Sequence, residues 1–427
     1  SLRHIVRIRK RKRMKKIIAT AFLVGLALQV SAQSGTNSPY SQYGLGALAS
    51  QATSFNRGMN GLAYGFHERS QVNYMNPASY ASVDSLSFIF DAGVSLQLTN
   101  FEEKGKKINA QNADIEYVVA SFRAFKHVGV SFGLLPYTNV GYNFSNTQNV
   151  NAFPSTSSPN ATYSNTYSGN GGLHLVYLGA GWEPFKGFSF GANIAYLWGT
   201  LNRNSTNSYS DSYVNTLSKN YTAQVKSYKA DFGVQYTYPI DRKNELTLGL
   251  AYSLGHTLNA EPECDLISTN SQTSVSDTTR YVVSKAFELP HTFGVGLMFN
   301  HNNRLKFGVD YQLQKWAKIR YPQLNTVSGR TSYSLVDGQF NDRHKLTLGG
   351  DYCKGERYRG FFSRMHYRAG FSYASPYLKI NGQDGPRELS ASLGVGIPIM
   401  NAYNNRSMLN ISAEWVNQSA TGLIKEN

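Results

Sequence analysis

The feature that most constrains the fold is a run of alternating apolar and polar residues that begins at Leu86. Every second residue from Leu86 to Leu98 is apolar, and the residues between them, Ile89 excepted, are polar or small. A period of two predicts a β-strand with one apolar face. The run exceeds the roughly 5–6 residues usual in soluble proteins, and a tilted strand of about 9–11 residues crosses a bilayer. We therefore expect a membrane-spanning strand over 85–99.

The N-terminal 32 residues predict export. Residues 1–13 are rich in Arg and Lys, and we interpret them as an upstream extension. From Met14 onward, two lysines precede an apolar stretch that ends near Val30, and small residues lie just before Gln33. This order predicts a signal peptide over 14–32, cleaved after Ala32. The alternative for residues 1–13, a nucleic-acid-binding arm, is disfavoured by the export signal.

The charge of the mature chain does not indicate a nucleic-acid partner. Nine basic residues and no acidic residue lie within the first 32, so removing them lowers the net charge from +16 to +7. The remaining basic residues are dispersed and form no basic helix. Nucleic acid is therefore excluded as the expected partner.

The composition instead predicts an outer-membrane β-barrel of a Gram-negative bacterium. Only 16% of the residues are charged and 13% are aromatic, and no apolar run after the signal approaches the roughly 20 residues of a membrane helix. A closed barrel can still span a bilayer because closure pairs every backbone group. Its expected surroundings are outer-membrane lipid and lipopolysaccharide.

Alternation recurs along the whole mature chain. Short turns and long loops separate the predicted strands in turn, as they do in single-chain outer-membrane barrels. The predicted strands are 85–99, 112–126, 128–144, 170–183, 187–202, 218–238, 245–259, 281–300, 304–320, 342–354, 363–375, 387–399 and 405–419.

Thirteen predicted strands conflict with the even number found in single-chain bacterial barrels. The sequence ends in a loop-like Gly-Leu-Ile-Lys-Glu-Asn. We therefore expect a fourteen-stranded barrel, over 85–427, from which the last strand is missing. Such a fragment would have two unpaired edges and would be unstable.

Residues 33–84 precede the first strand and predict a plug inside the barrel. They are rich in Gly, Ser, Asn and Gln, with scattered aromatic and Met residues that need a packing partner. The lumen of a wide barrel offers that partner; the alternative is a disordered periplasmic tail.

Two stretches resemble the FadL/TodX-type outer-membrane transporters. One is Asn76-Pro77-Ala78, just before the first strand, and the other is Leu289-Pro290-His291-Thr292 followed by a hairpin that contains Asp310 and Trp316. The resemblance covers the chain from about Tyr40 onward and implies a fourteen-stranded barrel with an N-terminal hatch. The same structural family includes PorV, a secretion-system protein, so fold does not settle function.

Pro136 is a candidate for a lateral opening. A proline inside a strand lacks a ladder donor and is expected at an edge or a bulge, and Gly141 follows it in the same strand. FadL-like barrels have a kinked third strand that opens sideways, and the resemblance implies that role here. The alternative is a tolerated bulge near the rim.

Neither catalysis nor metal binding is expected. The nine His residues are scattered and none lies in a catalytic motif, so we expect no enzyme, no catalytic residues and no cofactor. Two cysteines, Cys264 and Cys353, show no metal-type spacing. The acidic cluster Glu261, Glu263 and Asp265 has Ca²⁺-type ligands, but such side chains are usually solvated.

Candidate ligand contacts lie in the hatch. Apolar side chains there are candidates to line a pocket, with Arg57 or Arg69 meeting a carboxylate, but the favoured interpretation is that they anchor the plug to the wall. These candidates are Phe55, Arg57, Met59, Leu62, Phe66 and Met75. At the end of a later strand, Trp316 is expected in the aromatic girdle and Asp310 in a hydrogen-bond network of the lumen.

The expected function is passive uptake of hydrophobic, fatty-acid-like molecules through the hatch and out through the lateral wall. The alternative is a non-transporting accessory or scaffold subunit of an outer-membrane secretion or barrel-assembly complex. The first predicts a hydrophobic ligand, and the second predicts protein partners.

Overall fold

The computed structural model describes residues 35–427 except 86, 104, 150–160, 356–357 and 400–406. The predicted signal peptide and the upstream extension lie outside the described residues. Within them, no helix has the length and apolar character needed to cross a membrane.

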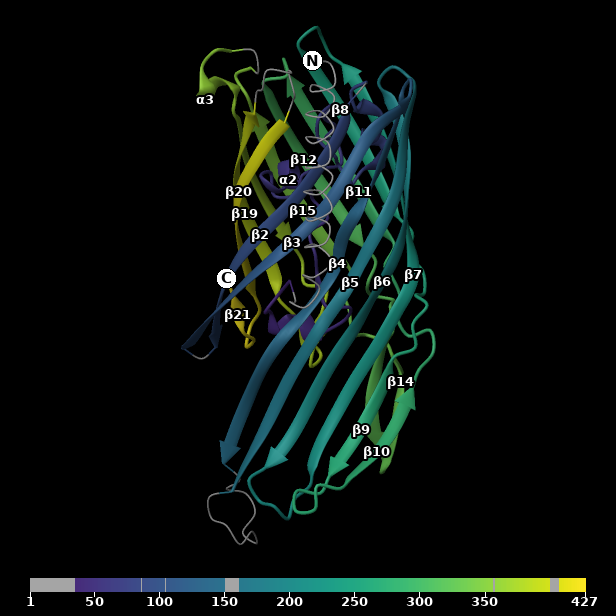
Figure 1. The fold of residues 1–427 in the computed structure, drawn as a ribbon, viewed down its shortest axis with the longest axis vertical. Helices are drawn as coiled ribbons and strands as arrows, with labels where there is room; N and C mark the ends of the chain where they lie inside the picture. Colours follow the sequence, from purple (N-terminus) through teal and green to yellow (C-terminus); the bar gives the residue numbers. More distant parts are fainter. Residues whose placement is uncertain (1–34, 86, 104, 150–160, 356–357, 400–406) are drawn as a thin grey trace, which may run out of the picture.

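The chain forms an antiparallel β-barrel whose strands follow one another around the wall (Figure 1). The wall strands are β2 (Phe88–Glu103), β3 (Lys106–Phe125), β4 (Val128–Asn149), β5 (Thr162–Phe185), β6 (Phe188–Tyr209), β7 (Thr216–Pro239), β8 (Asn244–Ser253), β11 (Thr292–His301), β12 (Leu305–Gln314), β15 (Arg343–Tyr352), β16 (His366–Ala374), β19 (Arg387–Ile399), β20 (Ser407–Ser419) and β21 (Lys425–Glu426).

The structure corrects the predicted number of thirteen strands. β21 is a fourteenth strand that pairs with β20 and with β2 and closes the sheet. The sequence did not reveal it because it contains only two residues, too few to show a period.

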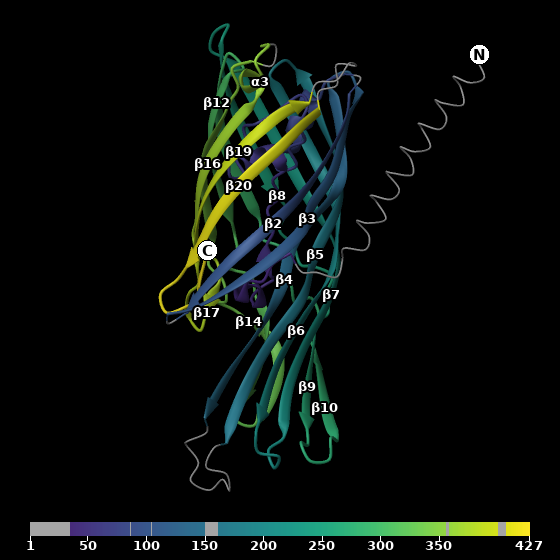
Figure 2. The same ribbon diagram turned by 60° about the vertical axis from the view of Figure 1, so that its left-hand side comes forward.

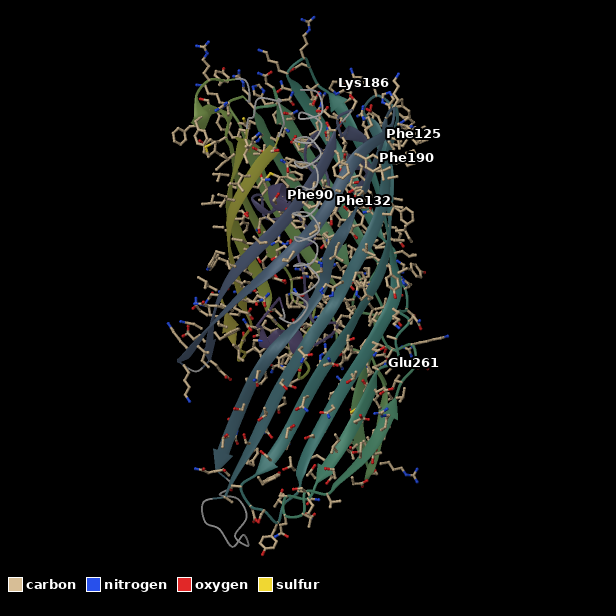
Figure 3. The ribbon with its side chains drawn as sticks, in the orientation of Figure 1. Phe90, Phe125, Phe132, Lys186, Phe190 and Glu261 are labelled. Atoms are coloured by element: carbon tan, nitrogen blue, oxygen red, sulfur yellow. The ribbon has the colours of Figure 1, made fainter. Side chains whose placement is uncertain are left out.

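The predicted alternation of apolar and polar faces is confirmed. On β8, for example, Leu246, Leu248 and Leu250 are exposed on the outer face, whereas Thr247 is buried on the inner face. Figure 3 shows Phe90, Phe132 and Phe190 at the wall, and all three are exposed apolar side chains.

Four strands run far beyond this apolar zone, where loops were predicted. β4 to β7 contain 22 to 24 residues each and continue as a wall in the lower half of Figure 1. Residues 203–217, which separate two predicted strands, are mostly strand. Residues 100–111, which separate the first two predicted strands, form most of a hairpin between β2 and β3. These segments are rich in Asn, Ser, Thr and Tyr on both faces, so they lack the apolar contrast that marks a strand in the sequence.

Smaller hairpins occupy the other predicted outer loops. β9 (Glu263–Thr269) pairs with β7 and with β10 (Ser276–Val282). The single strand predicted over 281–300 is therefore divided: it comprises the end of β10, a segment of coil and most of β11. The remaining pairs are β13 (Tyr321–Val327) with β14 (Arg330–Val336), and β17 (Lys379–Ile380) with β18 (Gln383–Asp384).

Residues 35–84, called the inner segment below, lie within the barrel (Figure 1, purple). They contain η1 (Pro39–Gln42), β1 (Ala47–Leu48), α2 (Ser54–Arg57) and η2 (Pro77–Ser82), and most of their side chains are buried. The remaining short helix, α3 (Phe361–Arg364), lies in a turn at the opposite end of the molecule from β9 and β10.

Candidate functional site

The Asn76-Pro77-Ala78 motif fixes the inner segment in place. Asn76 caps η2: its side-chain oxygen accepts a hydrogen bond from the backbone N–H of Ala78 at 3.2 Å, and its Nδ2 donates to the carbonyl of Tyr64 at 2.8 Å. Pro77 occupies the first helical turn, where its missing N–H costs nothing. All three residues are buried, so the motif acts as an internal turn that holds two parts of the segment together.

Glycines in the wall let the inner segment approach the backbone of the strands. A Cβ on Gly249 of β8 would overlap the carbonyl oxygen of Tyr64, and a Cβ on Gly191 of β6 would overlap that of Pro77. Contact at this distance is possible only without a side chain. The wall is thus shaped to the inner segment.

Asp310 provides the strongest polar anchor of this segment. Its carboxylate accepts hydrogen bonds from the backbone N–H groups of Ala63 at 2.6 Å and Tyr64 at 2.9 Å. The expected lumenal network of Asp310 is therefore present. Gln235 on β7 contributes from another side of the lumen by donating to the carbonyl of Tyr64 at 2.8 Å.

The apolar ligand candidates in the inner segment pack against one another. Phe55, Met59, Leu62 and Phe66 form one cluster with Met298 of β11, and each is almost completely buried. Met75 is only partly buried and does not belong to this cluster. The four clustered side chains pack against one another and against the wall, which agrees with the interpretation that they anchor the inner segment.

Both arginines of the inner segment lie near a carboxylate of the protein itself. Arg57 forms an ion pair with Glu116 of β3 at 2.6 Å and donates from Nε to the carbonyl of Ala52. Arg69 is exposed and faces Asp84 at 3.8 Å.

The wall parts between β3 and β4. The two strands pair from Phe125–Val128 to Val118–Leu134, and in the described residues no pairing continues beyond that point. Just past it, β4 has a bulge between Pro136 and Thr138 in its pairing with β5. The bulge expected at Pro136 is therefore present, at the place where β4 leaves β3.

The inner segment fills the space between the parted strands. β1 pairs with the free edge of β4, with Ala47 opposite Asn139 and Leu48 opposite Thr138. Gln51 donates from Nε2 to the carbonyl of Pro136 at 2.6 Å. On the β3 side, Asn37 donates from Nδ2 to the carbonyl of Gln111 at 3.3 Å.

Gly141 belongs to the same contact. Its backbone N–H donates to the hydroxyl of Ser41 at 3.1 Å, and the Ser41 hydroxyl lies 2.6 Å from the carbonyl of Ser38. Pro136 and Gly141 therefore both lie on the stretch of β4 that the inner segment covers. These side-chain and backbone contacts are few and separate, unlike a continuous ladder between strands.

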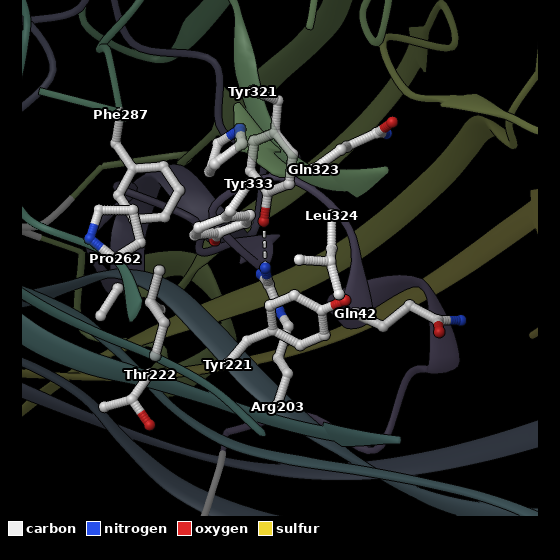
Figure 4. A pocket seen from close by; sticks show the side chains of 13 residues that line it. Gln42, Arg203, Tyr221, Thr222, Pro262, Phe287, Tyr321, Gln323, Leu324 and Tyr333 are labelled. Atoms are coloured by element: carbon white, nitrogen blue, oxygen red, sulfur yellow. Dashed lines mark hydrogen bonds between the residues drawn. The ribbon is translucent and has the colours of Figure 1, made fainter. Parts of the chain in front are cut away.

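A cavity of about 280 Å³ lies beyond the inner segment, between β6, β7 and the β13–β14 hairpin (Figure 4). Most of its walls are aromatic or aliphatic. The lining residues are Gln42, Leu201, Arg203, Tyr221, Thr222, Ala223, Pro262, Phe287, Tyr321, Pro322, Gln323, Leu324 and Tyr333. We call this cavity the outer pocket.

Arg203 is the cation of the outer pocket. Its guanidinium donates to the hydroxyl of Tyr321 and, at 2.6 Å, to the carbonyl of Gly44 in the inner segment, whereas its Nε has no hydrogen-bond partner. One cation and a few neutral polar groups among aromatic and aliphatic walls are typical of a site for a small amphipathic molecule. The sequence missed these residues because they come from separate segments: Arg203 and Tyr333 lie outside the predicted strands, whereas Tyr221 and Phe287 lie within two of them.

Three other expectations have definite outcomes. Trp316 is not in an aromatic girdle: only 1% of it is exposed, and its ring lies 5.6 Å from that of Phe340 inside the barrel. In the acidic cluster, Arg280 pairs with Asp265 at 2.7 Å and with Glu263 at 3.4 Å, and the Arg280 guanidinium lowers the pKa of the Asp265 carboxyl. Cys264 and Cys353 are buried and are not linked to each other.

Solved structures share this fold. The *P. putida* toluene transporter TodX is 13% identical with a TM-score of 0.58, covering 90% of this chain and 95% of that one. A *Pseudomonas aeruginosa* FadL homologue is 12% identical with a TM-score of 0.57, covering 89% and 95%. The *Ralstonia pickettii* toluene transporter TbuX is 14% identical with a TM-score of 0.53, covering 88% and 97%.

These likenesses confirm, at the level of fold, the resemblance to the FadL/TodX-type barrels. No sequence match was found among curated proteins. The family model BamG matches residues 14–427, which is nearly the whole chain. The chain therefore belongs to the BamG family.

Proposed function

We propose that this protein is an outer-membrane barrel that passes hydrophobic small molecules from the outer pocket, past the inner segment, to a lateral exit between β3 and β4. The exposed apolar zone of the wall supports placement in a membrane, because a barrel in lipid presents apolar side chains outward. The TodX and TbuX structures are those of toluene transporters. Because a shared fold does not by itself determine function, the proposal of a hydrophobic cargo rests on the pocket and the wall of this protein.

The parting of β3 and β4 is the observation that carries this proposal. A gap in a wall that faces lipid leaves backbone groups unpaired, which is costly unless another segment covers them. Here the cover is β1 and the residues around it, not a neighbouring strand. A cover held by a two-residue pairing and single hydrogen bonds can withdraw far more easily than a barrel strand.

The outer pocket provides the first binding place along this route. Its aromatic walls suit an apolar ring or chain, and the Arg203 Nε can meet one polar or anionic group. Arg203 also contacts Gly44 of the inner segment, so a bound molecule would touch the segment that has to move. A fatty-acid-like cargo is consistent with this combination of groups.

A disulfide lock tests the proposal. We would place cysteines at Ala47 and Asn139, which lie opposite each other across β1 and β4, in a background with Cys264→Ala and Cys353→Ala. Oxidation should abolish uptake of a hydrophobic fluorescent probe into proteoliposomes, and reductant should restore it. The matched control is a Thr237→Cys, Thr247→Cys pair across β7 and β8, away from the parting. Undiminished uptake by the oxidised Ala47–Asn139 variant would rule the lateral route out.

A scaffold subunit of an outer-membrane secretion or barrel-assembly complex is the second candidate. It is favoured by the polar wall formed where β4 to β7 continue beyond the apolar zone, since such a wall offers a large surface to other proteins. Native mass spectrometry of the protein, gently extracted from its own membrane, separates the two. A single chain with a small hydrophobic adduct supports transport, and a stable particle with other chains and no adduct supports the scaffold.

A further inference from the structure

A groove of about 920 Å³ lies on the outer face of the wall, over β12, β15, β16, β19 and β20. In Figure 2, β12, β16, β19 and β20 run side by side toward the end of the molecule at which α3 lies. Large apolar side chains that line the groove are exposed, among them Phe307, Leu348, Phe371 and Leu393. The volume is within the range of about 300–1,000 Å³ that is usual for small-molecule sites.

The groove results from a local lack of side chains on a complete part of the wall. Gly350 on β15 lies opposite Ala369 on β16, and both residues line the groove. In the same row, Phe307 of β12 and Leu393 of β19 flank this pair, and Phe299 of β11 follows beyond Phe307. β15 and β16 are each paired on both sides, so the depression is a property of these strands and not of a missing neighbour.

One end of the groove reaches the turn that contains α3. Tyr352 and Tyr367 line the groove and form the last residue pair of β15 and β16 before this turn. The hydroxyl of Tyr367 donates a hydrogen bond to the carbonyl of Phe362 in α3 at 3.1 Å. Phe361 and Phe362 are themselves exposed, Phe362 to 73%. Exposed aromatic residues next to an apolar wall are typical of a membrane–water interface.

The same turn carries positive charge. Residues 353–365 contain four basic residues and one acidic residue, a net charge of +3. Arg304 donates from Nη2 to the hydroxyl of Tyr358 at 3.4 Å, and Nζ of Lys354 lies 5.3 Å from the centre of the Tyr358 ring. Both cations are exposed, and among the described residues no carboxylate forms an ion pair with either of them. They are therefore available to an anion from outside the chain.

We propose that the groove and the α3 turn together bind one glycerophospholipid with an anionic headgroup. An acyl chain would lie in the groove, and the phosphate would meet Arg304 and Lys354. The two parts adjoin, because Arg304 directly precedes Leu305, which lines the groove, and Lys354 follows Tyr352 by two residues. Cations beside an apolar surface match the phosphate and the chain of such a lipid. The site requires the membrane placement of the proposed function but not its transport route.

The position of the α3 turn selects glycerophospholipid over lipopolysaccharide. This turn lies at the opposite end of the molecule from the long continuations of β4 to β7 and from the hairpin of β9 and β10. In outer-membrane barrels the short turns face the periplasm and the longer loops face the outside. The leaflet at the α3 turn is therefore expected to be the periplasmic one, which consists of glycerophospholipid.

Lipid titration followed by native mass spectrometry tests the headgroup site. The protein in detergent is titrated with phosphatidylglycerol and, separately, with phosphatidylcholine of the same acyl chains. An Arg304→Gln, Lys354→Gln double variant should bind phosphatidylglycerol about 25-fold more weakly, since each cation near the headgroup contributes about fivefold. Its preference over phosphatidylcholine should disappear. Arg304→Lys with Lys354→Arg keeps both charges and should retain the parent's affinity.

A second pair of variants tests the groove. Ala369→Leu puts a larger side chain on its floor and should weaken binding of both lipids about tenfold, the effect of about two methylene groups that lose their burial. The matched control is Ala192→Leu, at another exposed alanine, on β6, which does not line the groove. It should bind both lipids as the parent does. Folded mobility on a gel confirms that each variant is an intact barrel.

Three results would overturn the proposal. Unchanged phosphatidylglycerol affinity in the Arg304→Gln, Lys354→Gln variant would show that the α3 turn does not hold the headgroup. Equal effects of Ala369→Leu and Ala192→Leu would show that the chain does not lie in the groove. Tighter binding of lipid A than of phosphatidylglycerol, lost in the same double variant, would assign the site to lipopolysaccharide. The uptake assay with the cysteine lock across β1 and β4 has a separate readout, so failure of the lateral route would leave these results unaffected.

Discussion

Gln51 donates a hydrogen bond from its side-chain Nε2 to the backbone carbonyl of Pro136, at 2.6 Å. The contact joins the inner segment to the bulge of β4, at the place where β3 and β4 have parted. It is one of the few contacts that keep the proposed lateral exit covered, so its removal has a direct consequence.

Gln51→Ala should increase uptake of a hydrophobic probe. Losing one hydrogen bond costs about 1 kcal/mol, which corresponds to a roughly fivefold increase in the open population. Probe flux into proteoliposomes measures this. Gln312→Ala is the matched control, because Gln312 also donates to the inner segment, to the Tyr64 hydroxyl at 2.6 Å, but from β12 on another part of the wall. An equal flux increase in both variants would show that the effect does not depend on the contact that covers the exit between β3 and β4.

Asp310→Asn should loosen the inner segment. The substitution removes the negative charge of the acceptor but keeps an amide oxygen, so the hydrogen bonds from the N–H groups of Ala63 and Tyr64 become weaker, at a cost of about 2 kcal/mol. Limited proteolysis of the segment should become faster while the barrel stays folded. Asp277→Asn, at an exposed position of β10, should leave the digestion rate unchanged.

Gly249→Ala should displace the inner segment or prevent folding, because the new Cβ would overlap the carbonyl of Tyr64. The temperature at which the barrel loses its folded mobility on a gel should fall by several degrees. Gly329→Asn is a suitable control: Gly329 has a φ of +78°, which Asn tolerates, and nothing lies within 4 Å of its Cβ position. A Gly249→Ala protein with the parent's thermal transition would refute the close approach.

Tyr333→Ala should weaken binding of an aromatic fluorescent probe by about tenfold, since an aromatic contact with the ligand contributes about 1.5 kcal/mol. Tyr333 lines the outer pocket. Fluorescence titration in detergent measures the Kd. Tyr213→Ala, which removes an exposed tyrosine outside the pocket, should bind as the parent does. Identical Kd values for the two variants would show that the outer pocket is not the binding place.

The contact of β21 should weaken as pH rises. Glu426 lies on β21, which pairs with Phe101 and Glu102 beyond the apolar stretch of β2, and burial raises its pKa to about 7. Because this folded-state pKa exceeds the ordinary value of about 4.3, its contribution to stability is fully present below about pH 4.3 and is lost as pH rises through about 7. Hydrogen exchange at Asn427, corrected for intrinsic pH dependence, should show less protection at pH 8.5 than at pH 5.5. In Glu426→Gln this difference should disappear.

Much of the fold was accessible from the sequence because a strand with one apolar face repeats every second residue. The segment from Leu246 to Leu254 illustrates this, since its alternation correctly predicted both the strand and the outward face. Strands without an apolar face could not be predicted in this way. Residues 201–209 and 216–217 belong to β6 and β7, yet their sequence resembles that of a loop. Their pairing comes from neighbouring strands and not from local contrast.

The candidate site divides in the same way. Pro136 was recognisable because proline lacks an N–H donor wherever it stands, and Asn76 because Asn-Pro is a local turn signal. The sequence contained no sign of the outer pocket, because its residues Arg203, Tyr221 and Tyr333 come together from three separate strands. Trp316 was misplaced for a related reason: the sequence shows an aromatic residue at a strand end, but not which side its ring turns to.

The sequence alone therefore determined the export signal as an expectation, the all-β class and the apolar outer face, since these depend on local order and on a period of two. Only the tertiary structure decided that β21 pairs with both β2 and β20, and that β3 and β4 part. It also decided that Gln51 contacts β4 at the parting, and that Ser54 contacts both β2 and β20. These features depend on pairings between residues tens to hundreds of positions apart. No local pattern encodes such pairings, because they form only when the whole wall has curved into a barrel.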